Sequence, residues 1–556
     1  MPENCPEYKP MPNGTGPGTA ADVSPFLPMA PPSEAVQTFI AETDAFIIAQ
    51  ACDDLARYGT HPDFGALVRE QVEQILPQMP PVDLDAEEYL HSDASNALEL
   101  IRTYRHHIRY CTPWKAWLIW SGTHWQRDTT GTLMRWQRQT VKALSAQVPA
   151  LADEEAKKLL THIKSSLNTS RLEAAVRQAQ SWEGISIDSA GLDADPWRLN
   201  CANGTLDLRT GLLRRHHQAD MLTKCLAIPY SPEAACPTWD AFLRRIMGHS
   251  QGDDDPDTMS GAEMENRQQA DERARTLMAF LQRAIGYSLT GSTREQCLFI
   301  LHGPTKTGKS TFLATMRALL GPYGQQADME SFMHKDRAEV RNDLADLAGA
   351  RFVCALEGQE GKRLAENLIK QMTGGTDLMK ARFLYEEHFT FKPQFKIFLG
   401  TNHKPGIRDT DNAIWERIRL VPFIVQIPPE QRDKGLEEKL LTELPGILAW
   451  AVRGCLAWQQ RGNLGEPAAV LEATAGYRNE MDDVGRFLAE VCLLGHEAYK
   501  TKASVLLTAY HQWCGQQTLT GKAFAQHLHD KGYESKRSGS GNFWLRIGLP
   551  APEEPR

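Results

Sequence analysis

The pattern of apolar and polar positions changes along the chain and predicts several separate parts. Residues 1–34 are rich in Pro and Gly, which predicts a disordered tail. Apolar positions at helical spacing follow over 35–105. Over 106–248, helical stretches alternate with short strand-like runs that turn near Ser121-Gly122 and Asn203-Gly204. This stretch is therefore predicted to be an α+β domain.

The second half of the chain has a different pattern. Residues 249–272 are polar and acidic and predict a solvated linker, followed by a helix over 273–286. Residues 273–430 contain short apolar runs bounded by polar residues, as expected for buried strands of a parallel sheet. Apolar helices are predicted over 431–480. Three helices and a strand pair over 481–550 are typical of a winged-helix module. The predicted fold class is multidomain α/β.

The segment from Gly303 to Ser310 matches the phosphate-binding pattern G-x-x-x-x-G-K-[ST] at every fixed position. It lies between an apolar run, 297–301, and an amphipathic helix that starts near Thr311. Backbone N–H groups and a helix N-terminus there would hold phosphates, with Lys309 at the β/γ-phosphates and Ser310 on Mg²⁺. ATP and Mg²⁺ are the expected ligand and cofactor. The predicted ATP-binding residues are Gly303, Pro304, Thr305, Lys306, Thr307, Gly308, Lys309, Ser310 and Thr311.

Two further apolar runs end in polar side chains. Residues 351–356 lead into Glu357, and residues 395–401 lead into Asn402. The carboxyl ends of parallel strands meet at one edge of a sheet, so these side chains are expected beside Lys309. Glu357 could bind Mg²⁺ or polarise the attacking water, and Asn402 could orient that water or contact the γ-phosphate. Lys309, Glu357 and Asn402 are thus predicted catalytic residues.

The runs GPTKTGKST, ARFVCALEG, FKIFLGTN and WERIRLVPF resemble those of superfamily 3 helicases of the phage and plasmid primase–helicase family, whose relatives include poxvirus-type helicases. The resemblance is dense over 296–428 and looser over 105–245 and the C-terminal segment. It implies an AAA+-type P-loop ATPase core that assembles as a ring, usually a hexamer. It assigns Glu357 to the Walker B position and Asn402 to sensor 1. It also implies that Arg417 acts in trans on the neighbour's ATP, with Arg419 as the rival for that role.

The chain departs from the family pattern in two places. Glu357 is followed by glycine rather than preceded by a second acid, so either Glu357 or Glu360 could activate the water. The family often carries a primase domain with paired metal-binding carboxylates. Asp83 and Asp85 have the D-x-D spacing, but they follow two prolines and precede a helix-like run. They are interpreted as a loop and helix start, and primer synthesis is not expected.

The family resemblance also indicates where DNA would bind. In the family, residues 376–393 form a hairpin that projects into the central channel. Cations and aromatic rings in this segment suit sequence-independent tracking of a single strand. Aromatic residues Phe383, Tyr385 and Phe389 are either stacking faces or core residues. The candidate DNA-binding residues are Lys380, Arg382, His388 and Lys392 in the hairpin, with Lys536 and Arg537 in the C-terminal strand pair.

Composition changes this picture little. The net charge of −9 neither indicates nor excludes a DNA-binding protein, because a basic channel can lie inside an acidic protein. No apolar run is long enough to span a bilayer, no signal peptide is visible, and the 11 cysteines form no C-x-x-C pair. These features favour a cytosolic protein with no membrane partner, and the resemblance to phage and plasmid proteins implies the cytoplasm of a bacterial host.

The resulting hypothesis is an ATP-dependent DNA helicase for replication of a phage, satellite element or plasmid. Its expected partners are single-stranded and forked DNA, further copies of itself in a ring, and replication proteins of the host or element. Two alternatives stay open. One is a bifunctional primase–helicase with an N-terminal polymerase site. The other is a DNA-binding initiator whose ATP only switches assembly.

Overall fold

The computed structural model describes residues 91–249, 260–335, 342–357, 361–375, 377–382, 388–407, 412–515, 519–539 and 541–550. The tail predicted over 1–34, most of the helical region predicted over 35–105, and the Asp83–Asp85 pair lie outside these ranges. Of the predicted helical region, the structure describes α3, Asp93–Tyr104, which begins with a capping box between Ser92 and Ser95.

A small mixed sheet and four helices form the first described part. The sheet order is β3-β2-β1-β4, with β1 Ile108–Cys111, β2 Ala116–Trp120, β3 Trp125–Arg127 and β4 Ser186–Ile187. Strands β2 and β3 pair antiparallel across the Ser121-Gly122 turn, as predicted. Helices α4 (Thr132–Ala143), α5 (Asp153–Ser166) and α6 (Thr169–Ala179) accompany α3. Their buried residues form small clusters of their own.

An antiparallel meander and one helix follow. Strands β5 (Arg198–Cys201), β6 (Gly204–Asp207) and β7 (Leu212–Arg214) pair in this order. The β5–β6 turn requires Gly204, because its φ is 158° and a Cβ there would lie 2.3 Å from the backbone oxygen of Arg214. This confirms the hairpin predicted at Asn203-Gly204. Helix α7, Pro237–Met247, ends at Gly248 in the left-handed conformation.

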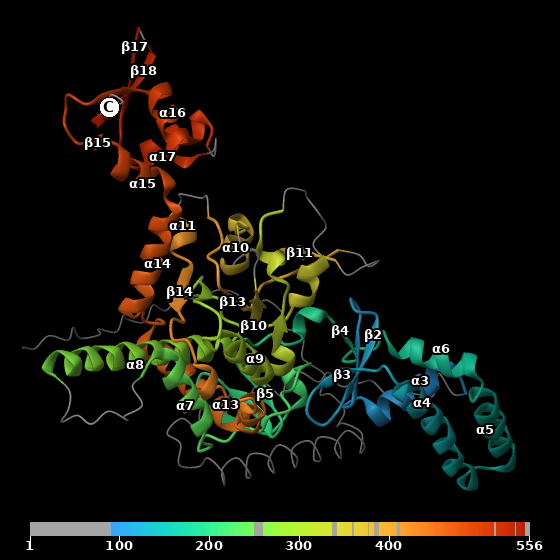
Figure 1. Cartoon of the computed structure of the whole chain (residues 1–556). Coiled ribbons are helices and arrows are strands. Elements are labelled where there is room, and N and C mark those ends of the chain that lie inside the picture. The colour runs from blue at the N-terminus through green and yellow to red at the C-terminus, as the bar shows by residue number, and fades with distance from the viewer. Residues whose placement is uncertain are drawn as a thin grey trace, which may run out of the picture. The chain divides into compact units, whose positions relative to one another are not determined.

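The acidic segment before the central sheet differs from its prediction. Helix α8 runs from Gly261 to Leu289, seen as the long green helix in Figure 1. The Ser260 side chain accepts from the Glu263 N–H, and the Glu263 carboxylate accepts from Ser260 at 2.8 Å. This capping box starts the helix twelve residues before the expected position at Arg273. The prediction of a linker over 249–272 was therefore wrong from Gly261 onward, and residues 250–259 are outside the described ranges.

A five-stranded parallel sheet forms the centre of the protein (Figure 1). Its strand order is β14-β8-β13-β10-β9, and every neighbouring pair is parallel. The strands are nearly continuous apolar runs because helices and loops cover both faces. The bounds are β8 Leu298–His302, β9 Gly324–Gln326, β10 Phe352–Leu356, β13 Lys396–Thr401 and β14 Ile418–Pro422, with helices α9 Lys309–Leu320, α10 Glu366–Thr373 and α11 Asn412–Trp415 between them. The prediction of a multidomain α/β fold with a parallel sheet is confirmed.

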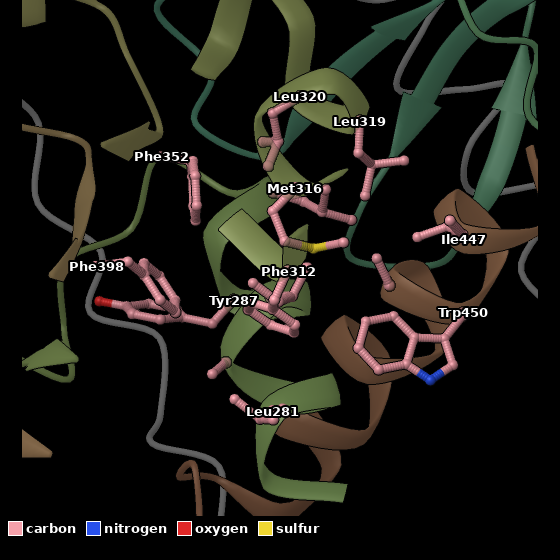
Figure 2. Packing of buried hydrophobic residues seen from close by; sticks show 14 of the residues in the cluster. Leu281, Tyr287, Phe312, Met316, Leu319, Leu320, Phe352, Phe398, Ile447 and Trp450 are labelled. Atoms are coloured by element: carbon pink, nitrogen blue, oxygen red, sulfur yellow. The ribbon is translucent and has the colours of Figure 1, made fainter. Parts of the chain in front are cut away.

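One large hydrophobic cluster contains residues of this sheet together with residues of segments that precede and follow it in the sequence. Helix α13, Leu444–Arg461, crosses α8 at Gly286 and Gly454, where a Cβ would lie 2.1 Å and 2.0 Å from backbone atoms of the other helix. Met316 and Phe312 of α9 pack in the same cluster as Tyr287 of α8 and Trp450 of α13 (Figure 2). The same cluster contains buried residues of β5, β6 and α7. The predicted boundary at residue 248 therefore does not separate two hydrophobic cores.

The C-terminal residues form a module with its own core, after α12 (Leu436–Thr442) and α14 (Ala468–Met481). Its helices are α15 Asp483–Val491, α16 Ala503–Cys514 and α17 Gly521–Asp530. Its strands are β16 Lys500–Lys502, β17 Ser535–Ser538 and β18 Gly541–Leu545 in one sheet, and β15 Leu493–Leu494 with β19 Ile547–Gly548 in another. These are the three helices and the strand pair that the sequence predicts.

No single helix of the described residues is long and apolar enough to cross a membrane. Two consecutive segments, Pro429–Thr442 and Leu444–Arg461, pass that test only as a pair bent by 74°. The second of them is α13, whose apolar residues are buried in the central cluster.

Candidate active site

The phosphate-loop sequence connects the end of β8 to the start of α9. Gly303 is required because a Cβ there would lie 1.8 Å from the backbone oxygen of Phe423. Gly308 has a φ of 88°, and a Cβ on it would lie 2.6 Å from Ile246 of α7. Both fixed glycines of the motif are therefore required by close contacts in this fold. The first backbone N–H groups of α9 have no partner within the helix and lie next to the loop.

Lys309 is the buried cation at the centre of this loop. Its side chain is 7% exposed, and its Nζ donates to the backbone oxygens of Gly303 and Pro304, both at 2.7 Å, and to Oγ1 of Thr307 at 3.2 Å. Burial lowers the pKa of Lys309 from its usual range. Oxygen ligands surround the ammonium, so phosphate oxygens could replace them there. Ser310, the next residue, is exposed in the first turn of α9.

The three predicted strand ends lie at the same edge of the sheet. In the register of the central strands, Thr401 of β13 pairs with His302 of β8, and Gly400 pairs with Leu356 of β10. The Glu357 N–H donates to the Gly400 oxygen at 3.0 Å, so Glu357 and Asn402 follow directly after these aligned positions. The strand β13 that leads to Asn402 lies between the strands that lead to Lys309 and Glu357.

Glu357 leaves its strand in an unusual conformation. Its φ is 58°, a left-handed value that costs free energy for a residue with a side chain and is often found at functional sites. Its carboxylate is exposed, while Asn402 is half-buried. The Ser310 hydroxyl and the Glu357 carboxylate are oxygen ligands of the kind that Mg²⁺ prefers. These residues fit a Mg²⁺–nucleotide site, and Glu360 lies outside the described residues.

Arg417 and Arg419 differ in their surroundings. Arg419 forms an ion pair with Glu466, whereas no carboxylate of the described residues pairs with Arg417. Arg417 instead donates to Thr373 Oγ1 at 3.2 Å and to the Ala413 oxygen at 2.6 Å. Its own oxygen accepts from the Leu298 N–H at the start of β8, so Arg417 lies at the amino edge of the sheet. The phosphate loop begins at the opposite end of β8, roughly 20 Å along the strand at about 3.3 Å per residue.

The segment predicted as a channel hairpin contains two antiparallel strands, β11 Met379–Ala381 and β12 Phe389–Phe391. Lys380 pairs with Thr390, and side chains alternate between the two faces. One face contains the buried residues Met379 and Ala381 with the half-buried Phe389 and Phe391, so Phe389 faces the core side. Lys380 lies on the opposite face and is exposed, and the other three predicted cations directly flank the strands: Arg382 is half-buried, whereas His388 and Lys392 are exposed. Residues 383–387, with Phe383 and Tyr385, are outside the described ranges.

Lys536 and Arg537 are exposed on β17 of the C-terminal module. Lys536 pairs with Phe543 of β18, which pairs in turn with Lys502 of β16. Lys500 Nζ lies 4.7 Å from the centre of the Phe543 ring. Lys500 and Lys502 thus share a sheet face with Lys536. Sequence reasoning missed them because only strand pairing brings them close to Lys536, which follows Lys502 by 34 residues. The neighbouring Trp544 is buried in the core of the module.

Sequence reasoning also missed the segment that supports the phosphate loop. The Phe423 N–H donates to the His302 oxygen at 2.8 Å, and the Ile427 N–H donates to the Lys306 oxygen at 2.9 Å. Lys306 has a φ of 65°, which this contact helps to hold. No motif marks residues 423–427, and only the fold brings them to the loop.

The fold and these strand ends define an α/β protein with a phosphate-loop sequence at the carboxyl edge of a parallel sheet. Two family models match the chain: "D5 N terminal like" over residues 97–248, and "Family of unknown function (DUF5906)" over residues 301–417. They cover the two stretches for which the motifs indicate a primase–helicase. The resemblance to the primase–helicase family is confirmed by these matches and by the relatives that follow.

The chain is 24% identical over 322 residues to "Putative helicase L207/L206" of Acanthamoeba polyphaga mimivirus, covering 54% of this chain and 31% of that protein. It is 26% identical over 255 residues to "Primase D5" of Fowlpox virus, covering 43% and 28%. The chain thus spans about a third of the length of these curated relatives. Among solved structures, the apo NrS-1 C-terminal region is 8% identical with a TM-score of 0.42, covering 82% of this chain and 99% of that chain.

Proposed function

We propose that this protein is an ATP-dependent DNA helicase of superfamily 3 that acts in DNA replication. The observation that carries the proposal is the alignment of Lys309, Glu357 and Asn402 at one edge of a parallel sheet. The relatives named helicase and primase support the replication class. The hydrolytic core would be an AAA+-type P-loop domain, and the C-terminal module a winged helix.

The proposal gives each residue of the site a role in catalysis or metal binding. Lys309, held at the loop centre, neutralises charge on the β/γ-phosphates. Glu357 projects from the strand end and accepts a proton from the attacking water or orders the metal, and Asn402 orients that water. Ser310 and Glu357 would hold Mg²⁺, which supplies Lewis-acid stabilisation of phosphoryl charge when bound.

Arg417 completes the site from a neighbouring subunit. It lies at the amino edge of the sheet, too far from the loop of its own chain to reach bound phosphates. A head-to-tail ring would place it at the next subunit's loop. An arginine without a carboxylate partner among the described residues is available for this role, whereas the charge of Arg419 is compensated by Glu466. The ring is proposed to be a hexamer.

Single-stranded DNA would lie on the cationic face of the β11–β12 hairpin. Lys380 lies on this face, Arg382, His388 and Lys392 flank the two strands, and spaced cations of this kind suit contacts with the phosphate backbone. Lys536 and Arg537 would contact the duplex arm of a fork. Replication proteins of the host or element are proposed as further partners.

The proposed setting is replication of a phage, satellite element or plasmid in a bacterial cytoplasm. The relatives reported above come from a mimivirus and a poxvirus. The bacterial host therefore stays a prediction that rests on the sequence motifs.

The proposal is tested with purified protein, with Lys309→Ala as the control. ATP hydrolysis is measured with and without single-stranded DNA, alongside unwinding of a forked duplex. DNA-stimulated turnover with unwinding, both lost in the variant, supports the helicase. DNA-dependent assembly with little turnover and no unwinding contradicts it and favours the ATP-switched initiator.

A bifunctional primase–helicase is the second candidate, because one relative is named a primase. Template-dependent primer synthesis is measured on the full chain with unlabelled and labelled ribonucleotides. Synthesis that disappears in Asp83→Ala and Asp85→Ala variants would establish this candidate. No synthesis in the unmodified protein would exclude it for this chain.

A further inference from the structure

A buried hydroxyl group, that of Thr373, contacts the side chain of Arg417. Thr373 is the last residue of α10 and is 3% exposed. Its Oγ1 donates to the Ile369 oxygen at 2.7 Å and accepts from Arg417 Nε at 3.2 Å. A threonine hydroxyl has one hydrogen to donate, and here Ile369 receives it. The Thr373 oxygen is therefore an acceptor for the arginine, which can only donate.

Two contacts fix the guanidinium of Arg417 from one side. Nε donates to Thr373, and Nη1 donates to the Ala413 oxygen at 2.6 Å. Among the residues that the structure describes, none accepts a hydrogen bond from Nη2, and Arg417 is half-buried rather than enclosed. A guanidinium is planar, so two fixed N–H groups set the direction of the rest. Nη2 is thus left to meet an anion that belongs to another molecule.

The chemical nature of the acceptor distinguishes Arg417 from Arg419. Arg419 is also held in place, because its Nη1 donates to the Glu416 oxygen at 2.6 Å, but its charge is paired with the Glu466 carboxylate. Thr373 is neutral. A neutral acceptor orients a guanidinium without compensating its charge, and the whole positive charge stays available to a phosphate. The Thr373 contact therefore suits an arginine that acts on phosphoryl oxygens.

The two partners are attached to one hydrophobic cluster. Ile369 of α10 and Ile414 of α11 are fully buried in it, and Ile418 of β14 is 1% exposed. Arg417 directly precedes Ile418, and Thr373 lies one turn after Ile369. Side chains in a close-packed core keep fixed positions. The cluster therefore holds the hydroxyl and the arginine at a constant separation, although 44 positions separate them in the sequence.

We propose that Thr373 is a positioning residue for Arg417. Its hydroxyl holds the guanidinium in the orientation that meets the phosphates bound by the neighbouring subunit. The inference rests on the proposed function, in which Arg417 acts in trans. Thr373 itself contacts neither the nucleotide nor the attacking water, so its whole effect on turnover passes through Arg417. No sequence motif marks this threonine, and only the fold brings it to the arginine.

The test removes the hydroxyl while keeping the branched shape of the side chain. ATP turnover and the Kd for ATP are measured on the full chain with Mg²⁺. Thr373→Val is expected to lower kcat on the order of 10-fold, the size of one hydrogen bond to a charged group, with the Kd for ATP unchanged. Thr373→Ser keeps the hydroxyl and should restore most of kcat.

Thr315→Val is the matched control. Thr315 of α9 is also 3% exposed, and its hydroxyl donates to the oxygen of the residue four positions earlier, Thr311, at 2.8 Å. The substitution therefore removes the same kind of bond within a helix, and no arginine of the described residues donates to this hydroxyl. Thr315→Val should leave kcat close to that of the unmodified protein.

A double variant separates positioning from a general effect on structure. If Thr373 acts only through Arg417, adding Thr373→Val to Arg417→Ala should cause no further loss of the residual turnover. Two independent effects would instead multiply. The single variants, the double variant and the unmodified protein form one thermodynamic cycle, which gives the coupling between the two side chains directly.

The possible results separate failure of the inference from failure of the proposed function. Unchanged kcat in Thr373→Val, together with an inactive Arg417→Ala, overturns the inference and leaves the proposed function intact. Loss of ATP binding in Thr373→Val, an equal loss of kcat in Thr315→Val, no recovery in Thr373→Ser, or multiplied losses in the double variant each overturn the inference as well. If the unmodified protein does not hydrolyse ATP, the proposed function fails and the inference fails with it.

Discussion

Replacing Arg417 by alanine should abolish ATP hydrolysis while leaving ATP binding intact. The side chain makes two hydrogen bonds in its own subunit, to Thr373 and Ala413, so the loss of stability should be about 1–2 kcal/mol. Its position at the amino edge of the sheet excludes a contact with any nucleotide bound at residues 303–310 of its own chain. An arginine supplied by a neighbour contributes on the order of 1,000-fold or more to turnover. A loss of this size is expected in kcat, with the Kd for ATP unchanged.

A mixing experiment separates action in trans from a structural effect. We expect Arg417→Ala and Lys309→Ala each to be inactive as pure proteins. In mixed rings, an Arg417→Ala subunit keeps its phosphate loop and can receive Arg417 from a Lys309→Ala neighbour. Random mixing at equal amounts makes roughly a quarter of the interfaces complete. Hydrolysis by the mixture should therefore recover to about that fraction of the unmodified rate.

Arg419→Ala is the matched control, because this arginine lies two residues away and is paired with Glu466. It should retain most of its hydrolysis. Two results would refute the reasoning. One is full ATPase activity of pure Arg417→Ala. The other is a mixture that stays inactive although the two proteins assemble together normally.

Two further predictions concern DNA binding and the core. Lys380→Ala and Lys392→Ala should each reduce the slope of log affinity for single-stranded DNA against log salt concentration by about 0.7, whereas the control Lys158→Ala on α5 should leave it unchanged. Fluorescence anisotropy over a series of salt concentrations measures this slope. An unchanged slope in the two hairpin variants would show that the hairpin does not contact DNA. Gly286→Ala should lower stability by about 1–3 kcal/mol, because its Cβ would meet the α13 backbone at 2.1 Å. Gly476→Ala on α14 meets no atom within 4 Å and should be neutral or stabilising by up to about 1 kcal/mol, as measured by denaturant unfolding.

Local patterns predicted the elements that hold the candidate catalytic residues. The loop motif fixed a strand before Gly303 and a helix after it, and both exist with close to the predicted bounds. Apolar runs ending in Glu357 and Asn402 predicted two more strands of a parallel sheet. These predictions succeeded because a buried parallel strand has a strong apolar signal and its carboxyl end is marked by a polar residue.

Features that depend on distant contacts could not be predicted in this way. The sequence analysis predicted the start of α8 too late because an acidic, Gly-containing run has the composition of a linker. The Ser260–Glu263 capping box nevertheless begins the helix within that run. The approach of Ile427 to the phosphate loop has no local signal. The same is true of Lys500 and Lys502, which join Lys536 only through strand pairing.

The end of a family match need not be the end of a hydrophobic core. The first family segment ends at residue 248, yet Trp239 of α7 stacks on Phe312 of α9, with ring centres 5.6 Å apart, and meets Trp450 of α13 at 5.4 Å. Ile246 lies where a Cβ on Gly308 would clash. Removing the chain before residue 249 would expose these rings and withdraw the support behind the phosphate loop. The two matched segments therefore form one physical unit around the phosphate-loop sequence, and a protein cut at the family boundary would lack the support that α7 gives to this loop.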